Sequence, residues 1–508
     1  MLAHAAAVDP AHDAVMLGEQ RLSYGDLARC VTAFADELLA RKIGAGSRVA
    51  LLMHNSIDMV VALFGVMAAG AQLVPLNPAY TTNELGPILD NADCLALVYD
   101  TSVASRLSEL LDRFDADLRV AVGPHDRVLT HGAATSAKGP MPLPAPDSLS
   151  MLLYTGGTTG RSKGVDLLHR AIAVNVSQRV ALLPAREGIE RVLVVTPLYH
   201  SYAMSTCFTT VLSRGTLVLI DRYQADAVLR LIDSARVTIL AGSPTIFVGL
   251  LACDAMASAS LDSLVCAYSG SAALSMETLR QWEQKTGAIV VEGYGQTEAG
   301  PVLTYNPLAG PRKTGSVGIA VPLTEVQIVD LQTGEQVLGP GELGEIRARG
   351  PQIMQGYRGL PDETAAALRD GWLYTGDIGE VDTQGYFFIR DRKKDMVIVS
   401  GFNVYPREVE EALFSHPMVR EAAVVGIPDD YRGESLVALV VPSCDGLSEE
   451  QLRAYLAQRL VKYKLPTRID LVPGLPKTAV GKTDKVGIRR NLLKSVDASP
   501  TSTSRSGE

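Results

Sequence analysis

The sequence predicts an α/β fold in two parts: a large N-terminal domain of mostly parallel βα layers with an antiparallel β subdomain, and a small C-terminal α+β domain. Two observations predict this division. From residue 23 to about residue 291, short β-rich apolar runs alternate with helical stretches, which is the pattern of βα units. After Gly315 the runs become short and alternating, and Gly-rich turns join them, which favours antiparallel sheet. A chain of 508 residues is also long enough for more than one domain.

The elements of the large domain follow from its apolar runs. Ser23 is expected to cap the helix that contains Leu27. A buried helix is expected over Ile57–Ala69, because the apolar stretch Met59–Ala71 is shorter than the roughly 20 residues that a membrane span requires. The predicted strands are Arg48–Met53, Leu73–Leu76, Met151–Tyr154, Val192–Thr196, Leu217–Ile220, Thr238–Leu240, Leu264–Tyr268 and Ile289–Val291.

The second half of the chain predicts the antiparallel subdomain and the small domain. The antiparallel strands are expected at Val326–Val329, Gly344–Arg349 and Gly385–Arg390. The small domain is expected to contain, in order, a strand (Val397–Ser400), a helix (Pro406–Phe414), two strands (Ala422–Ile427 and Leu436–Val441) and a helix (Glu449–Leu460). The predicted division is therefore a large domain at residues 1–391, a connecting segment at 392–395, a small domain at 396–494 and a polar tail at 495–508 that is expected to be disordered.

Charge and cysteine content exclude several classes of protein. The chain has 47 Lys and Arg against 56 Asp and Glu, a formal net charge of −9. Nucleic acid is not an expected partner, because neutralising phosphates requires a basic face. The six cysteines are scattered without CxxC spacing, which excludes a disulfide scaffold and an obvious zinc site and favours a cytoplasmic location. No secretory signal or integral membrane segment is expected, while peripheral membrane contact and the oligomeric state stay open.

The segment Tyr154–Gly164 (YTGGTTGRSKG) carries the strongest local signal for a ligand. Its glycines let backbone N–H groups approach phosphate oxygens, its hydroxyls add donors and its lysine supplies charge. It differs from a Walker A loop, because Ser162 precedes the lysine. A helix is expected to begin near Val165, after the loop. The predicted phosphate-binding residues are Thr155, Gly156, Gly157, Thr158, Thr159, Gly160 and Lys163.

Four further segments combine with this loop: EGYGQTE at 292–298, YTGDIG at 374–379, DRKKD at 391–395 running into VSGFNVYP at 399–406, and PKTAVGK at 476–482. With them the chain, over about residues 20–494, resembles the adenylate-forming superfamily of acyl-CoA synthetases, luciferases and peptide-synthetase adenylation domains. Within that superfamily it is most similar to bacterial fatty acyl-CoA ligases. The resemblance implies a ligase that uses ATP, Mg²⁺ and coenzyme A. Such an enzyme joins a carboxylate to AMP and then replaces AMP with a thiol.

The resemblance also implies roles for residues of the large domain. The loop at 155–163 would hold the pyrophosphate end of ATP, and Thr297 would contact the α-phosphate. Glu298 and Thr155 would be the ligands of Mg²⁺, a hard cation that suits oxygen ligands. His200 would border the acyl pocket at the catalytic centre. The residues implied to contact the adenine are Tyr294, Gly295, Gly270, Ser271 and Ala272.

Further roles are implied for Asp377 near the end of the large domain, for Arg392 in the connecting segment and for a lysine of the small domain. Asp377 and Arg392 match a pair that engages the ribose hydroxyls. Lys482 resembles a catalytic lysine that reaches between the α-phosphate and the carboxylate, where negative charge develops. Lys477 and Lys485 are the nearby alternatives to Lys482.

One active site would serve both half-reactions by rotation of the small domain. Lys394 aligns with the hinge of that rotation. Ser400 and Gly401 would then face the thiol, and Gly401 suits close passage of the pantetheine arm.

The identity of the acid is less clearly marked. His200 stands where amino-acid-activating relatives place an aspartate, and Gly293 stands where malonate-activating relatives carry an arginine. A monocarboxylate is therefore expected, with a medium- or long-chain fatty acid as the first hypothesis. An aryl or other small monocarboxylate is the alternative, as is an enzyme that delivers its acyl group to a carrier protein. A non-catalytic nucleotide sensor and an oxygen-using luciferase are rival hypotheses from other classes.

Overall fold

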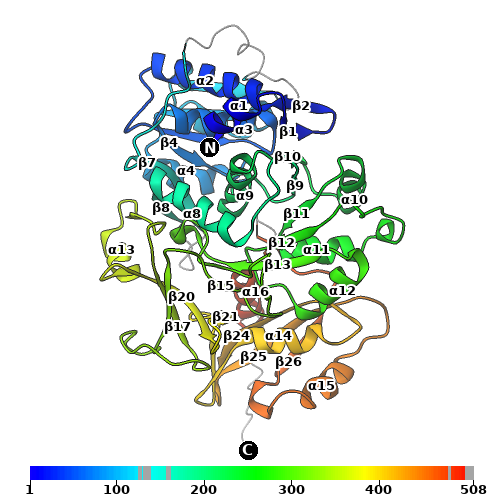
Figure 1. Ribbon diagram of the computed structural model, residues 1–508. Coiled ribbons are helices and arrows are strands. Elements are labelled where there is room, and N and C mark those ends of the chain that lie inside the picture. Colours follow the sequence, from blue (N-terminus) through cyan, green and yellow to red (C-terminus); the bar gives the residue numbers. More distant parts are fainter. Residues whose placement is uncertain (124–128, 130–138, 156–161, 479–481, 498–508) are drawn as a thin grey trace, which may run out of the picture. The chain divides into compact units, whose positions relative to one another are not determined.

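The computed structural model describes residues 1–123, 129, 139–155, 162–478 and 482–497 (Figure 1). Its chain divides into two compact units. The first consists of the described residues of Met1–Leu274, Thr278–Thr375 and Val381–Phe388. The second consists of Ser275–Glu277, Gly376–Glu380 and the described residues of Ile389–Glu508.

A large sheet of the first unit contains nine strands in the part of the chain that the structure describes. Its core is parallel, from β1 through β10, β9, β11 and β12 to β13, and antiparallel strands close both edges. In spatial order the strands are β15 (Ile319–Ala320), β14 (Thr304–Tyr305), β13 (Ile289–Tyr294), β12 (Cys266–Ser269), β11 (Ile239–Gly242), β9 (Arg191–Val194), β10 (Thr216–Leu219), β1 (Asp13–Leu17) and β2 (Gln20–Ser23).

A second sheet of this unit has seven described strands. The pairs β4–β7, β4–β3, β3–β5 and β5–β6 are parallel, whereas β7–β8 and β8–β18 are antiparallel. The order is β18 (Gly356–Tyr357), β8 (Lys163–Leu168), β7 (Leu149–Thr155), β4 (Gln72–Pro75), β3 (Arg48–Leu52), β5 (Ala96–Asp100) and β6 (Arg119–Val122). The predicted α/β fold with mostly parallel sheets is confirmed.

The two sheets share a middle layer of helices. In β9, Val192 and Val194 belong to one core, whereas Leu193, together with Val195 just after the strand, belongs to another. This alternation is expected of parallel strands buried on both faces. The first core also takes residues from α2, α3, α8, α9 and the second sheet, so these helices lie between the sheets. Helices α10, α11 and α12 cover the outer face of the first sheet, as Figure 1 shows, and α4 and α5 cover that of the second.

The helices before residue 370 have the following bounds: α1 (Leu2–Val8), α2 (Tyr24–Ala40), α3 (Ile57–Ala68), α4 (Thr82–Ala92), α5 (Ser108–Leu111), α8 (His169–Leu182), α9 (Ser201–Leu212), α10 (Ala225–Ser234), α11 (Pro244–Leu251), α12 (Met276–Thr286) and α13 (Pro361–Ala367). Ser23 caps α2, as predicted, by accepting a hydrogen bond from the backbone N–H of Asp26. This removes one of the unsatisfied N–H donors at the helix start.

One predicted element is wrong. The chain after the glycine-rich loop forms strand β8, and the helix expected near Val165 begins only at His169. Val165 and Leu167 are buried while Asp166 and Leu168 are half-exposed, a period of two that a strand requires. The loop therefore joins two antiparallel strands, and no helix N-terminus follows it directly.

The third sheet is antiparallel, as predicted, in the pairs β16–β17 and β19–β20. The described strands are β16 (Glu325–Val329), β17 (Gly344–Arg349), β20 (Trp372–Val381), β19 (Leu368–Arg369) and β21 (Phe387–Arg392), which pairs with β20. The sequence prediction missed β20, which contains the glycine-interrupted run YTGDIG.

The second unit has its own sheet and helices. The described strands are β23 (Phe402–Val404), β22 (Val397–Val399), β25 (Gly433–Pro442), β24 (Val419–Asp429) and β26 (Arg468–Leu471). Helices α14 (Pro406–Phe414) and α15 (Glu449–Ala457) contribute to one core. Helix α16 (Lys485–Asp497) contributes Ile488 and Leu492 to another. The predicted strand end at Ser400 is wrong by one residue, because Ser400 lies in a turn. Helix α16 was not predicted, and it runs to Asp497, into the segment expected to be a tail; residues 498–508 of that tail lie outside the described residues.

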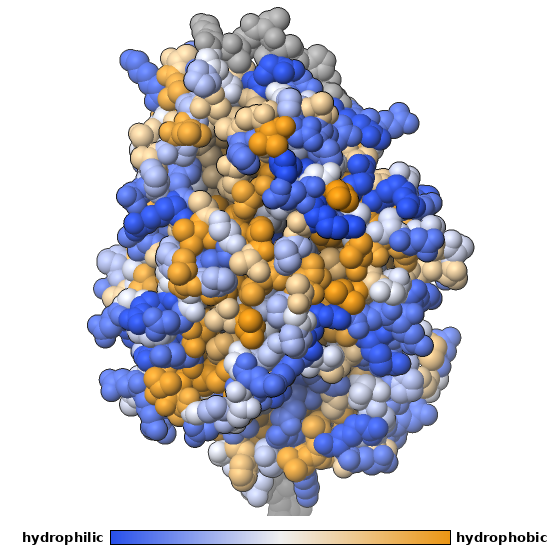
Figure 2. Space-filling view, in the orientation of Figure 1, coloured by the Kyte–Doolittle hydropathy of each residue, from blue (hydrophilic) through white to orange (hydrophobic). Residues whose placement is uncertain are grey.

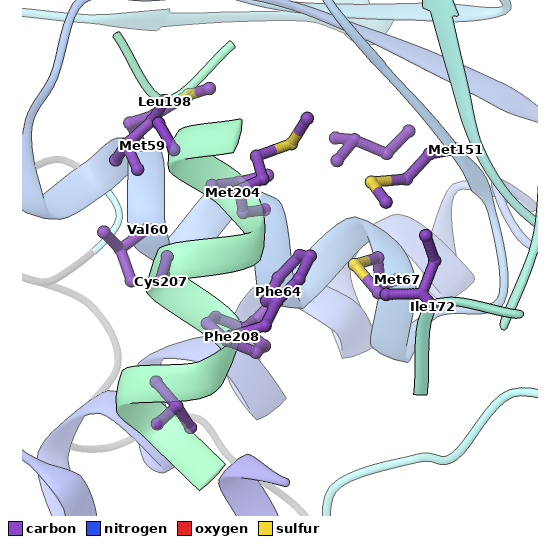
Figure 3. Close-up of a cluster of buried hydrophobic side chains, with 14 of the residues drawn as sticks. Met59, Val60, Phe64, Met67, Met151, Ile172, Leu198, Met204, Cys207 and Phe208 are labelled. Carbon is purple, nitrogen blue, oxygen red and sulfur yellow. The ribbon is translucent and has the colours of Figure 1, made fainter. Parts of the chain in front are cut away.

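Helix α3 is buried over its whole length, as expected for a helix inside the protein. Phe64 from α3 and Phe208 from α9 lie edge to face with ring centroids 5.6 Å apart, and methionines fill the space around them (Figure 3). Among the described residues, no helix combines the length and apolarity needed to cross a bilayer. On the face drawn in Figure 2, hydrophobic residues are interspersed with hydrophilic ones.

Candidate active site

Buried polar atoms without hydrogen-bond partners gather beyond the carboxyl ends of the first sheet. Within the described part of the chain they include Thr196 Oγ1 after β9, Ser269 Oγ and Ser271 Oγ at the end of β12, and Gln296 Nε2 after β13. Buried polar groups in proteins are normally paired, so a cluster of unpaired ones calls for an explanation. Ligands of open α/β sheets bind at the carboxyl ends of the strands. This edge is therefore the candidate binding site for the first unit.

The predicted adenine strip, residues 270–272, directly follows β12 at this edge. Ser271 has a φ of +71°, a region that non-glycine residues seldom occupy and that is enriched at functional sites. A side chain at Gly270 would approach the ring of Tyr202 to 2.7 Å, and one at Gly295 would approach the carbonyl oxygen of Pro301 to 1.9 Å. Both glycines are required by close packing. Ala272 continues the strip and is exposed.

Glu298 lies in a short 3₁₀ turn, Thr297–Ala299, and is only 8% exposed. Its carboxylate Oε1 accepts a hydrogen bond of 2.8 Å from the hydroxyl of Tyr357 in β18. Burial, and next the charge of Glu298, raise the pKa of Tyr357, so the phenol stays protonated and donates. The ammonium of Lys163 lies 5.0 Å from the centroid of the same ring and pairs with Glu363. A buried carboxylate, a phenol and a lysine thus form one linked group.

Tyr357 was missed by the sequence analysis. It is 59 residues from Glu298, and a lone tyrosine beside a glycine carries no chemical marker. It reaches Glu298 because β18 pairs with β8, the strand that follows the glycine-rich loop.

His200 lies at the start of α9, and Thr297, in the 3₁₀ turn, contacts the first residue of that helix. The hydroxyls of Ser201 and Thr297 are 3.5 Å apart. The Nδ1 atom of His200 accepts from the backbone N–H of Tyr202 at 3.4 Å, so the imidazole caps the helix. This cap needs an unprotonated Nδ1.

The remaining predicted residues of this unit are only partly described. Tyr294 ends β13 and is half-buried. Thr155 ends β7, and its hydroxyl is 3.5 Å from the carbonyl oxygen of Lys163. Five of the predicted phosphate-binding residues lie outside the described residues: Gly156, Gly157, Thr158, Thr159 and Gly160.

The second unit brings together three predicted residues from distant segments. Arg392, at the end of β21, pairs with the buried Asp377 of β20, Nε to Oδ1 3.3 Å. Lys482 lies within electrostatic reach of both. Burial and then the charge of Arg392 lower the pKa of Lys482 to about 8, and Asp377 opposes the shift. The sequence separation of these residues gave no hint of this grouping beyond the family resemblance.

The two alternatives to Lys482 are already engaged. Lys477 pairs with Glu421, and Lys485 pairs with Glu410 at 2.7 Å. Lys482 has no ion-pair partner within the part of the chain that the structure describes. It is half-buried, and two hydrogen bonds join its backbone to Thr478. Of the three lysines, Lys482 alone has an ammonium group available to a ligand.

Lys394 and Ser400-Gly401 lie in turns. Lys394 is exposed between Arg392 and Asp395, whose N–H donates to the carbonyl of Arg392 at 2.9 Å. Ser400 and Gly401, with φ of +51° and +85°, form the two-residue turn between β22 and β23. Two positive φ values are typical of tight hairpins, so the turn itself requires this glycine.

The oxygen ligands near Glu298 fit a Mg²⁺ site of the kind that is shared with substrate phosphates. No group of three or more His, Cys, Asp or Glu residues among those the structure describes could hold a metal on its own. Mg²⁺ does not require one, because it keeps several waters and is held by one or two carboxylates together with substrate phosphates. The buried carboxylate of Glu298 fits this requirement.

Comparison with known proteins identifies the family of the chain. A family model for "AMP-binding enzyme" matches residues 2–358, and one for "AMP-binding enzyme C-terminal domain" matches residues 408–482. A long-chain-fatty-acid–CoA ligase of Bacillus subtilis (strain 168) is 36% identical over 528 residues, covering 97% of this chain and 93% of the relative. A feruloyl-CoA synthase of an Amycolatopsis species is 37% identical over 491 residues, covering 96% and 97%. The crystal structure of ATP-bound MatB from Rhodopseudomonas palustris has a TM-score of 0.89 and 33% identity, covering 96% and 98%. The chain therefore belongs to the AMP-binding enzyme family.

Proposed function

We propose that the protein is an ATP-dependent acyl-CoA ligase. In the first step a carboxylate oxygen of the acid attacks the α-phosphorus of ATP, which gives acyl-AMP and pyrophosphate. In the second step the thiol sulfur of coenzyme A attacks the acyl carbon. The acyl–oxygen bond breaks, AMP leaves and the thiol proton is released. Both steps build negative charge on oxygens, so fixed cations and hydrogen-bond donors dominate catalysis.

The observation that carries the proposal is the state of Lys482. It is a cation with no ion-pair partner among the described residues, beside the pair of Asp377 and Arg392, while its two neighbouring lysines are ion-paired. In this proposal Asp377 and Arg392 hold the ribose hydroxyls, and Lys482 stabilises charge between the α-phosphate and the attacking carboxylate. Its half-buried position supports this role, because a cation acts more strongly where water is excluded.

In the first unit, Tyr294 and the strip Gly270–Ala272 are proposed to enclose the adenine, with Thr297 at the α-phosphate. The unpaired Ser269 and Ser271 hydroxyls supply hydrogen-bonding capacity there. Glu298, with Thr155, is proposed to hold Mg²⁺, which when bound neutralises phosphate charge. Tyr357 orients the carboxylate of Glu298 through its hydrogen bond. Lys163 exchanges its pairing with Glu363 for the terminal phosphates of ATP.

The second half-reaction is proposed to follow a rotation at Lys394. That residue is exposed in a turn, so a change of its backbone dihedrals does not remove its own side chain from a packed core. Ser400 and Gly401 would then line the path of the thiol. The cytoplasm is the proposed location.

A medium- or long-chain fatty acid is the proposed substrate, because the chain shares 36% identity with a long-chain-fatty-acid–CoA ligase over almost its full length. The similarity to a feruloyl-CoA synthase supports an aryl acid as second candidate. Delivery to a carrier protein instead of coenzyme A is the third.

The test is AMP release measured with ATP, Mg²⁺ and a panel of alkyl and aryl carboxylates, with and without coenzyme A. We expect AMP and thioester to form in equal amounts when coenzyme A is present. Pyrophosphate release without thioester formation would favour a carrier-protein acceptor. Absence of pyrophosphate release with every acid would refute the proposal.

A further inference from the structure

Helix α8 buries an arginine completely. Arg179 is 1% exposed, and its Nη1 donates to the hydroxyls of Ser205 (3.3 Å) and Thr206 (3.0 Å) on α9. Its Nη2 is buried and finds no hydrogen-bond partner among the described residues. Among the residues that the structure describes, no carboxylate pairs with it.

Three tyrosines surround the guanidinium. The centroids of their rings lie 5.9 Å (Tyr202), 5.3 Å (Tyr268) and 5.6 Å (Tyr305) from its Cζ atom. Their faces attract the cation, but such contacts only partly replace the water that a buried charge loses. A buried cation with a free donor is costly unless a further acceptor is supplied. The side chain is therefore prepared for an acceptor that is not part of the chain.

The tyrosine cage forms the back of the candidate site. The ring of Tyr202 lies against Gly270, and that of Tyr305 lies so close to Gly293 that a Cβ there would approach it to 2.3 Å. Ser205, which Arg179 contacts, also lines an apolar cavity of about 10 Å³, room for about one water, that reaches Ser201. Ser201 in turn contacts Thr297. The guanidinium is thus connected through adjoining residues to the proposed reaction centre.

We propose that Arg179 is a specificity residue that binds an oxygen acceptor at the far end of the acyl group. This inference rests on the proposed ligase function. The preferred substrates are then carboxylic acids that carry a second oxygen function, a carboxylate, carbonyl or hydroxyl, distal to the reacting carboxylate. Gly293 supplies no cation for such a group, and Arg179 supplies one from another element, α8. A donor that would otherwise stay unpaired discriminates strongly against substrates that lack the acceptor.

The test compares kcat/KM for acids of equal length, from hexanoic to hexadecanoic, in four forms: unsubstituted, ω-carboxy, ω-hydroxy and ω-amino. At the best length we expect an ω-carboxy or ω-hydroxy acid to exceed the unsubstituted acid roughly 10- to 100-fold, the discrimination that one hydrogen bond to a charged group gives. The ω-amino acid, a cation, is expected to be the poorest. The ratio of ω-carboxy to ω-hydroxy acid decides between an anionic and a neutral acceptor.

Arg179→Met is expected to abolish or invert this preference, and Arg179→Lys to keep part of it. Arg170→Met on the same helix is the control, because Arg170 is exposed and pairs with Asp147. A purely structural arginine would change stability without changing the ratio between matched acids.

The experiment distinguishes failure of the inference about Arg179 from failure of the proposed ligase function. Equal or higher kcat/KM for unsubstituted acids at every length in the wild-type enzyme would overturn the inference and leave the ligase function standing, even if Arg179→Met failed to fold. No adenylation of any acid would instead refute the ligase function itself.

Discussion

Replacing Lys482 by alanine separates the two half-reactions. Among the described residues the lysine has no ion-pair partner to lose, and it is only half-buried, so the fold is expected to tolerate its truncation. If its charge acts only while the carboxylate attacks the α-phosphate, adenylation is affected and thioester formation is not. Loss of one preorganised charge donor typically costs about 10²–10³ in rate, or roughly 3–4 kcal/mol.

The lowered pKa of Lys482 also predicts how the rate of adenylation depends on pH. With a pKa of about 8, about ten molecules in eleven carry the charge at a pH of about 7, and about one in eleven at a pH of about 9. Protonated lysine is the active form, so raising the pH through its pKa removes activity. We expect kcat/KM for adenylation, which reports the free enzyme, to fall about tenfold across this interval. The alanine variant is expected to lack that decline.

The assays are ATP–pyrophosphate exchange for the first step and conversion of synthetic acyl-AMP by coenzyme A for the second. Lys477→Ala is the matched control, because this lysine of the same loop is already paired with Glu421. It is expected to leave both steps near wild type. Equal loss of both steps in a well-folded Lys482→Ala protein would refute the reasoning, and so would a comparable adenylation defect in Lys477→Ala.

Three further changes test other parts of the structure. Tyr357→Phe removes the hydrogen bond to Glu298. The Mg²⁺ concentration for half-maximal adenylation should therefore rise roughly tenfold, with little change in melting temperature. An unchanged Mg²⁺ dependence would contradict the positioning role of Tyr357. Lys394→Pro restricts φ at the proposed hinge, so thioester yield should fall more than pyrophosphate release; parallel loss would argue against rotation there. Asn55→Ala should lower the free energy of unfolding, measured in urea, by about 2 kcal/mol or more. The buried side-chain amide of Asn55 forms hydrogen bonds with three backbone groups, including the N–H of Leu198 at 2.7 Å. A change near zero would refute this expectation.

Many strands and helices of the fold could be predicted from the local sequence. Strands such as β3 and β9 could be predicted because apolar, β-branched residues ran continuously between turns, and the helix beginning at Pro406 because it followed a recognisable start. The helix predicted near Val165 was wrong, because the chain after the loop continues as strand β8. Its period of two, with Val165 and Leu167 buried, was present but short.

For the candidate site as well, some features follow from the sequence and others only from the tertiary structure. The sequence by itself determined the family, through five motifs in order, and it nominated Glu298 and Lys482 because each lay within such a motif. Only the tertiary structure decided which lysine lacks an ion pair among the described residues, which tyrosine donates to Glu298, and that no described carboxylate pairs with the buried Arg179. The physical reason is that motifs and periodicity are local, whereas burial and pairing depend on which distant strands and helices meet. A charge becomes available or costly only through neighbours that the chain brings to it from far along its length.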